Sequence, residues 1–196
     1  TFARTDLVTH SPVTGRFAGT ADGMTLAGLC EATITTSDNS AANFILESCG
    51  GPAALTRFAR ELGDGTTRLD RMETELNNGT AAALLDTTTP RAMALTLHKL
   101  LLGSALAPAS RERLQQWLVG NTTGDQRLRA GLPAGWRVGD KTGTNQTDAN
   151  DIGIAWPTNG RPPLIITAYL AESAASSAVK EATLAGVARL AAGLVA

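Results

Sequence analysis

The sequence contains few residues that bind metals or form disulfides. Its 196 residues include two cysteines, Cys30 and Cys49, and two histidines, and the cysteines do not form a Cys-x-x-Cys pair. A metal site built from closely spaced ligands is therefore not expected, and no cofactor is predicted. Each cysteine is expected to be a small buried apolar side chain.

The chain also lacks an excess of charge, a run of like charges and a long apolar segment. The formal net charge is -1 and the isoelectric point is about 6.1, without the basic character of proteins that bind nucleic acid or anionic membranes. The apolar stretches are short and interrupted, so none is expected to span a bilayer. We expect a globular protein that acts on a small molecule or serves only for packing, with no nucleic-acid and no membrane partner. The chain opens at Thr1 without a signal-peptide pattern, so targeting information is expected outside it.

Three short motifs follow one another in a fixed order. They are Ser37-Asp38-Asn39, Glu73-x-x-Leu76-Asn77 and Lys141-Thr142-Gly143. Taken alone, the first is typical of a helix N-cap and the third is a frequent chance tripeptide. Together and in this order they describe an acyl-transfer active site.

Periodicity predicts helices first and strands afterwards. Helical spacing and caps predict helices over about 26–36, 41–50, 52–62, 90–102 and 108–118. Alternation predicts strands over about 136–144, 152–156 and 164–170, the last apolar and buried on both faces, with a hairpin turn at Thr158-Asn159-Gly160. A closing amphipathic helix carries the apolar stripe Val179, Thr183, Val187, Leu190 and Leu194.

This order of elements predicts an α+β fold. We expect a mostly helical lobe over residues 1–134, which includes an Ω-loop at 68–86. Residues 135–196 are expected to form a second lobe of three antiparallel strands and a covering C-terminal helix.

The segment from Thr66 to Thr89 has no periodicity, and disorder is one interpretation of its polar sequence. In the other interpretation, a bidentate ion pair between Arg71 and Asp86 closes its neck into an Ω-loop. Glu73 and Asn77 lie four residues apart and would face the same way on one helical turn, where they could hold a water. The alternative for these two residues is an exposed surface turn.

Other residues are predicted to act on an ester or amide substrate. Lys141 would bind a substrate carboxylate and lower the pKa of a nearby hydroxyl, and Ser37 would relay a proton to a leaving nitrogen. Further substrate contacts are predicted for Asn39, Thr142, Gly143 and Thr144, the last through a backbone N–H directed at an oxyanion. Arg127 is either a second cation behind Lys141 or a solvated helix residue.

The chain resembles the class A serine β-lactamases over essentially its whole length. Besides the three motifs, the similar segments are Leu7–Thr14, Asp70–Asn77, Asp86–Arg91 and Asp140–Thr144. The resemblance implies a two-lobe α/β fold, hydrolysis of the β-lactam amide through an acyl-serine, antibiotic resistance, no metal, and a periplasmic or secreted location. Thr144 and Arg127 together resemble the broader-spectrum members that hydrolyse carbapenems.

Two features depart from that family. His10 stands where the family usually has an aromatic residue at the cleft entrance, which bears on substrate binding. No Ser-x-x-Lys precedes Ser37, and the one at Ser177–Lys180 follows Lys141 and is interpreted as chance. We therefore expect the nucleophile on an N-terminal segment outside this sequence, covalently attached or as a separate fragment.

The resemblance has consequences for stability. In many family members the counterpart of Cys30 bonds a cysteine of that upstream segment. The family's opening helix and first two strands pack beside the last strand and final helix. Residues 1–196 alone are therefore expected to be unstable, and the complete molecule to be a monomer.

Two other functions remain open. A penicillin-binding D-alanyl-D-alanine peptidase would share the acylation chemistry but would lack the deacylating water. The pair Glu73 and Asn77 argues against this peptidase, because it is suited to hold such a water. A catalytically inert β-lactamase-like fragment is the literal interpretation, because Ser37 has no adjacent Lys or His base in the sequence.

Overall fold

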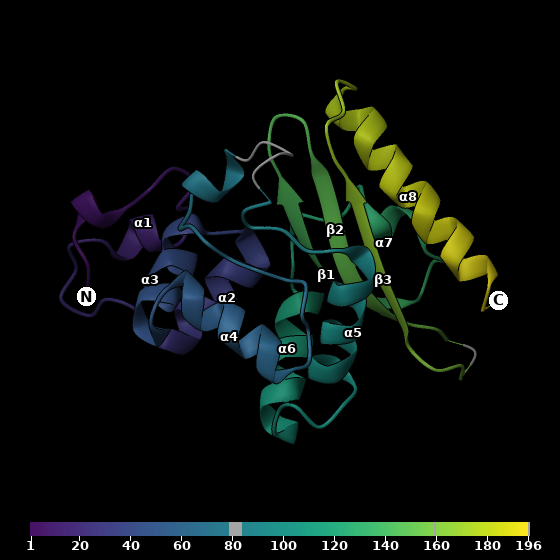
Figure 1. The fold of residues 1–196 in the computed structure, drawn as a ribbon, viewed down its shortest axis with the longest axis horizontal. Coiled ribbons are helices and arrows are strands. Elements are labelled where there is room, and N and C mark those ends of the chain that lie inside the picture. The colour runs from purple at the N-terminus through teal and green to yellow at the C-terminus, as the bar shows by residue number, and fades with distance from the viewer. Residues whose placement is uncertain (79–83, 159, 196) are drawn as a thin grey trace. The chain divides into compact units, whose positions relative to one another are not determined.

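The computed structural model describes residues 1–78, 84–158 and 160–195 (Figure 1). The chain divides into two compact units, Thr1–Thr89 and Pro90–Ala196. The boundary between these units, at 89/90, is based on contacts. The predicted lobe boundary at 134/135 is based on a change of sequence pattern, and it stays a prediction.

The first unit is helical. Its elements are η1 (Arg4–Asp6), α1 (Thr14–Phe17), α2 (Leu26–Thr36), α3 (Asn39–Cys49), α4 (Pro52–Glu61) and η2 (Glu75–Asn77). Gly50 ends α3 in the left-handed conformation and Pro52 opens α4, as the sequence predicts. The Thr25 side chain caps the start of α2. Leu29, Ala32 and Ala41 form a small core between α2 and α3.

The second unit combines helices with a sheet. Its elements are α5 (Pro90–Leu101), α6 (Pro108–Val119), α7 (Leu128–Gly131), β1 (Arg137–Thr144), β2 (Ala149–Trp156), β3 (Leu164–Leu170) and α8 (Ser177–Gly193). The strands are antiparallel in the order β1-β2-β3, and Thr144 pairs with Ala149 where β1 turns into β2. The predicted fold, helices followed by an antiparallel sheet and a closing helix, is confirmed.

Helices cover both faces of this sheet (Figure 1). On one face, Ile166 and Ala168 of β3 pack with Leu128 of α7 and Leu184 of α8. On the other face, Thr167 of β3 donates a hydrogen bond to the carbonyl of Pro90 in α5. Only Ile166 and Ala168 are fully buried in β3, and the alternate residues are half-buried. The prediction that β3 is buried on both faces was therefore right for one face only.

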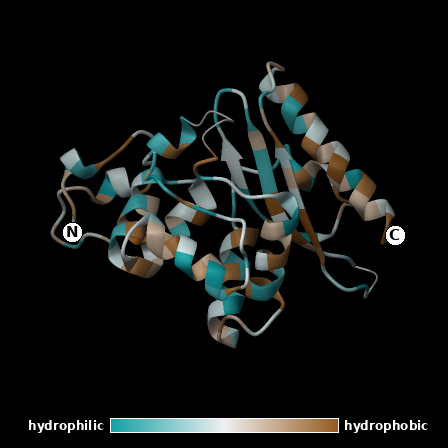
Figure 2. Cartoon of the chain, viewed as in Figure 1, coloured by the Kyte–Doolittle hydropathy of each residue, from teal (hydrophilic) through white to brown (hydrophobic). Residues whose placement is uncertain are grey.

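Apart from Leu184, the large apolar side chains of helix α8 do not face the sheet. Val179, Val187, Leu190 and Leu194 are exposed, Leu194 by 85%. The buried residues are Lys180, Leu184, Ala185, Ala188 and Ala192, although apolar residues are visible along the helix in Figure 2. Small side chains let α7 and α8 approach closely, since a Cβ at Gly131 would overlap the Ala185 carbonyl. The apolar stripe predicted from the sequence therefore lies on the solvent-exposed face of α8 and not on the face that packs against the sheet.

The two cysteines differ in exposure. Cys49 is exposed rather than buried, because it lies in the last turn of α3, whereas Cys30 is half-buried. Burial raises the pKa of the Cys30 thiol. The predicted hairpin turn includes Asn159, which lies outside the described residues.

Among the described helices, none has the length and apolar character needed to cross a membrane.

Candidate active site

Asp38 organises the Ser37-Asp38-Asn39 motif in the first unit. Ser37 ends α2 in the left-handed conformation, with a φ of 56°. The fully buried Asp38 carboxylate accepts hydrogen bonds from the N–H groups of Val13, Thr14 and Ala41, each at 2.9 Å, and from the Thr14 hydroxyl at 2.8 Å. One side chain therefore caps α3 and ties the motif to the start of α1.

Asn39 and His10 lie together in the same unit. The Asn39 N–H donates to the His10 carbonyl at 3.0 Å, and the Asn39 Nδ2 donates to the Thr9 carbonyl at 2.9 Å. The His10 ring lies 3.1 Å from the Thr36 carbonyl through its Nε2. His10 has a φ of 63°, which is strained for a residue with a side chain. One backbone hydrogen bond therefore joins Asn39 to His10, and the Asn39 side chain binds the neighbouring Thr9; the substrate contacts of both residues stay predictions.

Glu73 and Asn77 bind one another directly. The Asn77 Nδ2 donates to Glu73 Oε2 at 2.7 Å; Asn77 is the last residue of η2, and Glu73 lies in the turn just before that helix. Both residues are half-buried. Asn43 of α3 fixes the backbone of Glu73, since its Oδ1 accepts from the Glu73 N–H and its Nδ2 donates to the Glu73 carbonyl, each at 2.8 Å. The two groups therefore contact each other directly, and their role in holding a water stays a prediction.

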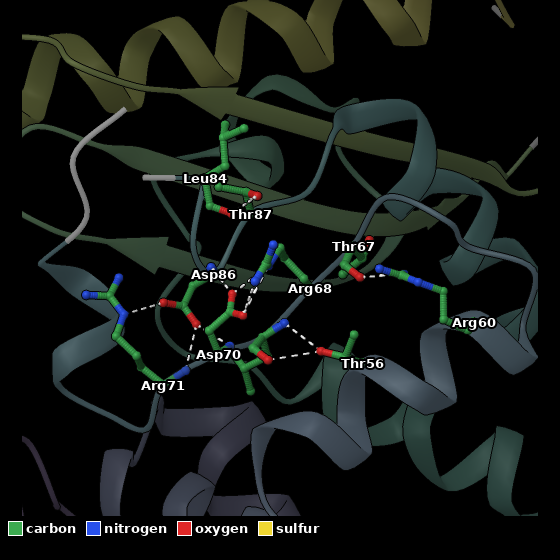
Figure 3. Close-up of polar contacts among 10 residues, drawn as sticks. Thr56, Arg60, Thr67, Arg68, Asp70, Arg71, Leu84, Asp86 and Thr87 are labelled. Atoms are coloured by element: carbon green, nitrogen blue, oxygen red, sulfur yellow. Dashed lines mark hydrogen bonds and ion pairs between the residues drawn. The ribbon is translucent and has the colours of Figure 1, made fainter. Parts of the chain in front are cut away.

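The loop neck is closed by Asp86 (Figure 3). Its Oδ1 accepts from the N–H groups of Asp70 and Arg71, at 2.7 and 3.0 Å, and its Oδ2 accepts from Arg71 Nε at 2.6 Å. The Asp86 side chain is 4% exposed. The ion pair with Arg71 is therefore present, but the guanidinium uses a single N–H rather than the predicted bidentate fork, because backbone N–H groups occupy the other carboxylate oxygen. Arg68 adds an exposed pair with Asp70.

In the second unit, Lys141, Thr142, Gly143 and Thr144 are consecutive residues of β1. The Lys141 Nζ donates to the Thr142 carbonyl at 2.6 Å. Thr142 is 8% exposed, and its hydroxyl oxygen lies 2.6 Å from that of Thr123. Alternation along the strand places Lys141 and Thr142 on opposite faces of the sheet.

Arg127 is 6% exposed, so it is not a solvated helix residue. It donates to the carbonyls of Gly143 and Asn150, at 3.1 and 2.8 Å, and to the Thr144 hydroxyl at 2.7 Å. Its Nε lies 3.8 Å from Glu181 Oε1 on α8. The guanidinium therefore joins the ends of β1 and β2, and its role as a second substrate-binding cation stays a prediction.

The structure adds residues that sequence reasoning missed. Asn43 and Thr123 each contact a predicted site residue but belong to no motif. In the sequence, the only signal for Asn43 is that it is a polar residue on the inner side of a helix, four positions after Asn39. Among the described residues, no group of three or more His, Cys, Asp or Glu side chains is placed to hold a metal ion.

Comparisons with known proteins agree with the motifs. The model of the β-lactamase enzyme family matches residues 1–194. β-Lactamase L2 of Stenotrophomonas maltophilia is 51% identical over 187 residues, which is 95% of this chain and 61% of the relative. The carbapenem-hydrolysing β-lactamase KPC of Klebsiella oxytoca is 46% identical over 192 residues, or 97% of this chain and 64% of the relative.

Solved structures give the same result. The last common ancestor of Gram-negative bacteria class A β-lactamase (GNCA4) matches with a TM-score of 0.96 and 55% identity, covering all of this chain and 74% of the ancestor. The chain belongs to the β-lactamase enzyme family. Within that family it is a homologue of the class A β-lactamases. It spans between about half and two thirds of the length of the curated relatives that it matches.

Proposed function

We propose that the protein hydrolyses the β-lactam amide bond through an acyl-serine intermediate and thereby confers resistance to β-lactam antibiotics. In this proposal Glu73 acts as the general base for the water that releases the acyl group, and Asn77 holds that water together with Glu73. The observation that supports it most is the 2.7 Å hydrogen bond between the two side chains. It directs a carboxylate and an amide to one point, where a water could contact both.

The remaining site residues have proposed roles on the substrate. Lys141 provides the positive charge for the substrate carboxylate, Thr142 and Arg127 support it, and the Thr144 N–H stabilises the oxyanion. Ser37 transfers a proton to the leaving nitrogen, and Asn39 binds the substrate amide. His10 replaces an aromatic residue at the cleft entrance and shapes access to it.

The nucleophilic serine is proposed to come from a segment outside these 196 residues. No Ser-x-x-Lys precedes Ser37 in the sequence, and the curated relatives are longer than the matched region. The segment is either covalently attached or a separate fragment. We place the protein in the periplasm or outside the cell and propose that the complete molecule acts as a monomer.

Turnover and mass test this function together. The protein isolated from its source should hydrolyse a chromogenic cephalosporin with many turnovers, and its intact mass should exceed 20.3 kDa. A penicillin-binding peptidase would instead release one equivalent of product and stall as an acyl-enzyme. Absence of both turnover and a covalent adduct with the cephalosporin would reject both enzymes in favour of an inert fragment.

A further inference from the structure

Two carboxylic acids lie beside each other in the interior of the second unit. Asp140 on β1 and Asp151 on β2 are both 0% exposed. Thr142 is the register partner of Asp151, so Asp140 lies diagonally across from Asp151 on the same face of the sheet. The proposed function gives neither acid a role, and a buried pair of acids needs a physical explanation.

The oxygens of the two acids differ in their partners. Asp140 accepts a hydrogen bond at each oxygen, from Arg129 Nε and, at 2.7 Å, from Asn121 Nδ2. Asp151 Oδ2 accepts from the Leu128 N–H at 3.0 Å. Asp151 Oδ1 is buried and has no donor among the described residues. An ionised oxygen without a donor is costly in a protein interior, whereas a protonated oxygen can donate to an acceptor.

The nearby cations do not balance two negative charges. Arg129 of α7 is bound to Asp140. Arg127 binds two carbonyls and a hydroxyl of β1 and β2 and lies 3.8 Å from Glu181 of α8. Lys180 of α8 donates to the Gln146 carbonyl in the β1–β2 turn. On this face β3 contributes the apolar residues of the core, and α5 lies against the opposite face.

These surroundings favour the neutral form of Asp151. Burial, the negative charge of Asp140 and a hydrogen bond with Asp140 raise the pKa of Asp151 to about 8. The Leu128 N–H and Arg127 oppose this shift without cancelling it. An acid with such a pKa retains its proton at neutral pH.

We propose that Asp151 is protonated in the folded protein at neutral pH and donates its Oδ1 proton to the Asp140 carboxylate, so that the two acids share one negative charge. This arrangement gives Asp151 Oδ1 the partner that it otherwise lacks. It leaves the charge on Asp140, where Arg129 and Asn121 stabilise it.

The shared proton lies at one end of a hydrogen-bonded chain. Asn121 donates to Asp140, and its own Oδ1 accepts from the Thr123 N–H and hydroxyl, at 3.1 and 2.8 Å. Because the Thr123 hydroxyl proton is directed to Asn121, the Thr142 hydroxyl is the donor in its 2.6 Å contact with Thr123. Asp151 is therefore a positioning residue for Thr142, and this consequence rests on the proposed function. The protonation of Asp151 does not.

The variant Asp151→Asn mimics the neutral acid, because an amide can donate to Asp140 and accept from the Leu128 N–H. The folded pKa of Asp151 is raised, so its contribution to stability is complete below its unfolded pKa of 3.8 and is lost as the pH rises to about 8. The asparagine does not titrate. Between about pH 5 and about pH 7.5, the folding equilibrium constant of the wild type relative to the variant should fall about tenfold per pH unit, the effect of one proton. A ratio that stays constant over this range overturns the proposal.

A second measurement detects the protonated carboxyl group directly. Carbon-13 NMR of the aspartate carboxyl groups at pH 6 should show one protonated aspartate in the wild type. Asp151→Asn should remove this resonance, whereas Asp125→Asn, which removes an exposed acid, should leave it in place. A spectrum in which every aspartate is ionised at pH 6 overturns the proposal. Neither measurement depends on β-lactam turnover, so a protein without that activity would still reveal the shared proton.

Discussion

The side-chain amide of Asn43 binds the backbone of Glu73 on both sides, through one accepted and one donated hydrogen bond of 2.8 Å each. Glu73 lies in a loop, where the backbone has no regular ladder of hydrogen bonds to hold it. The Asn43 side chain extends from α3 and supplies that support. The Glu73 carboxylate then remains available for Asn77.

Replacing Asn43 should therefore affect the loop more than the helix. Asn43→Ala leaves two backbone groups of Glu73 without their partners, at a cost of roughly 1–3 kcal/mol in the free energy of unfolding. Deacylation should slow more than acylation, as measured by pre-steady-state kinetics with a cephalosporin. Ser48→Ala, an exposed change on the same helix, is the matched control. Equal melting temperatures and equal turnover in both variants would contradict the role of Asn43 in holding the Glu73 backbone.

The neck of the loop offers a second test. Arg71→Ala removes the guanidinium from the buried Asp86 carboxylate, which should cost roughly 1.5–3 kcal/mol and impair deacylation first. Arg68→Ala removes only an exposed pair with Asp70 and should change stability little. Urea unfolding and turnover of both variants provide the measurement. Wild-type hydrolysis of every substrate by Arg71→Ala would count against a closed neck.

Gly124 is required by the buried Asp140 network. A Cβ at this position would overlap Asp140 Oδ2 and its contact with Asn121. Gly124→Ala should destabilise the protein by roughly 1–3 kcal/mol through overpacking. Gly15→Ala, where an added Cβ meets no atom within 4 Å, should be neutral or slightly stabilising. Thermal melts of the two variants check this, and equal effects would contradict the tight contact.

The outward face of α8 leads to a prediction about residues 1–196 expressed alone. Leu190 and Leu194 are 77% and 85% exposed, and β3 lies at the edge of the described sheet. This chain should self-associate, and Leu190→Lys should reduce that association, as measured by analytical ultracentrifugation. Leu184→Lys, at a 2% exposed position on the same helix, should unfold it instead. A cooperative melt of a monomeric chain would show the prediction to be wrong.

The fold was predictable where local signals agreed. Thr25, Gly50 and Pro52 mark helix ends by side-chain or backbone chemistry that acts within a few residues, so the helix bounds follow from the sequence. The orientation of α8 was not predictable from hydrophobicity. Its alanine-rich face packs because small side chains allow close approach to Gly131, a tertiary property that outweighs the size of Leu190 and Leu194.

The site was predictable only in part for a similar reason. The spacing of Glu73 and Asn77 is local and gives their contact directly. The partners that hold the motifs come from distant positions, such as Thr14 on Asp38 and Asn43 on Glu73. No spacing rule connects residues 24 to 30 positions apart, so these contacts required the structure.

The most direct measurement is the intact mass of the Glu73→Ala protein during incubation with a cephalosporin, with Glu75→Ala on the same turn as control. Glu73→Ala should accumulate a long-lived adduct with the mass of the opened β-lactam, while Glu75→Ala should turn the substrate over like the wild type. Wild-type turnover by Glu73→Ala, with no adduct, would contradict the assignment of Glu73 as the base that releases the acyl group.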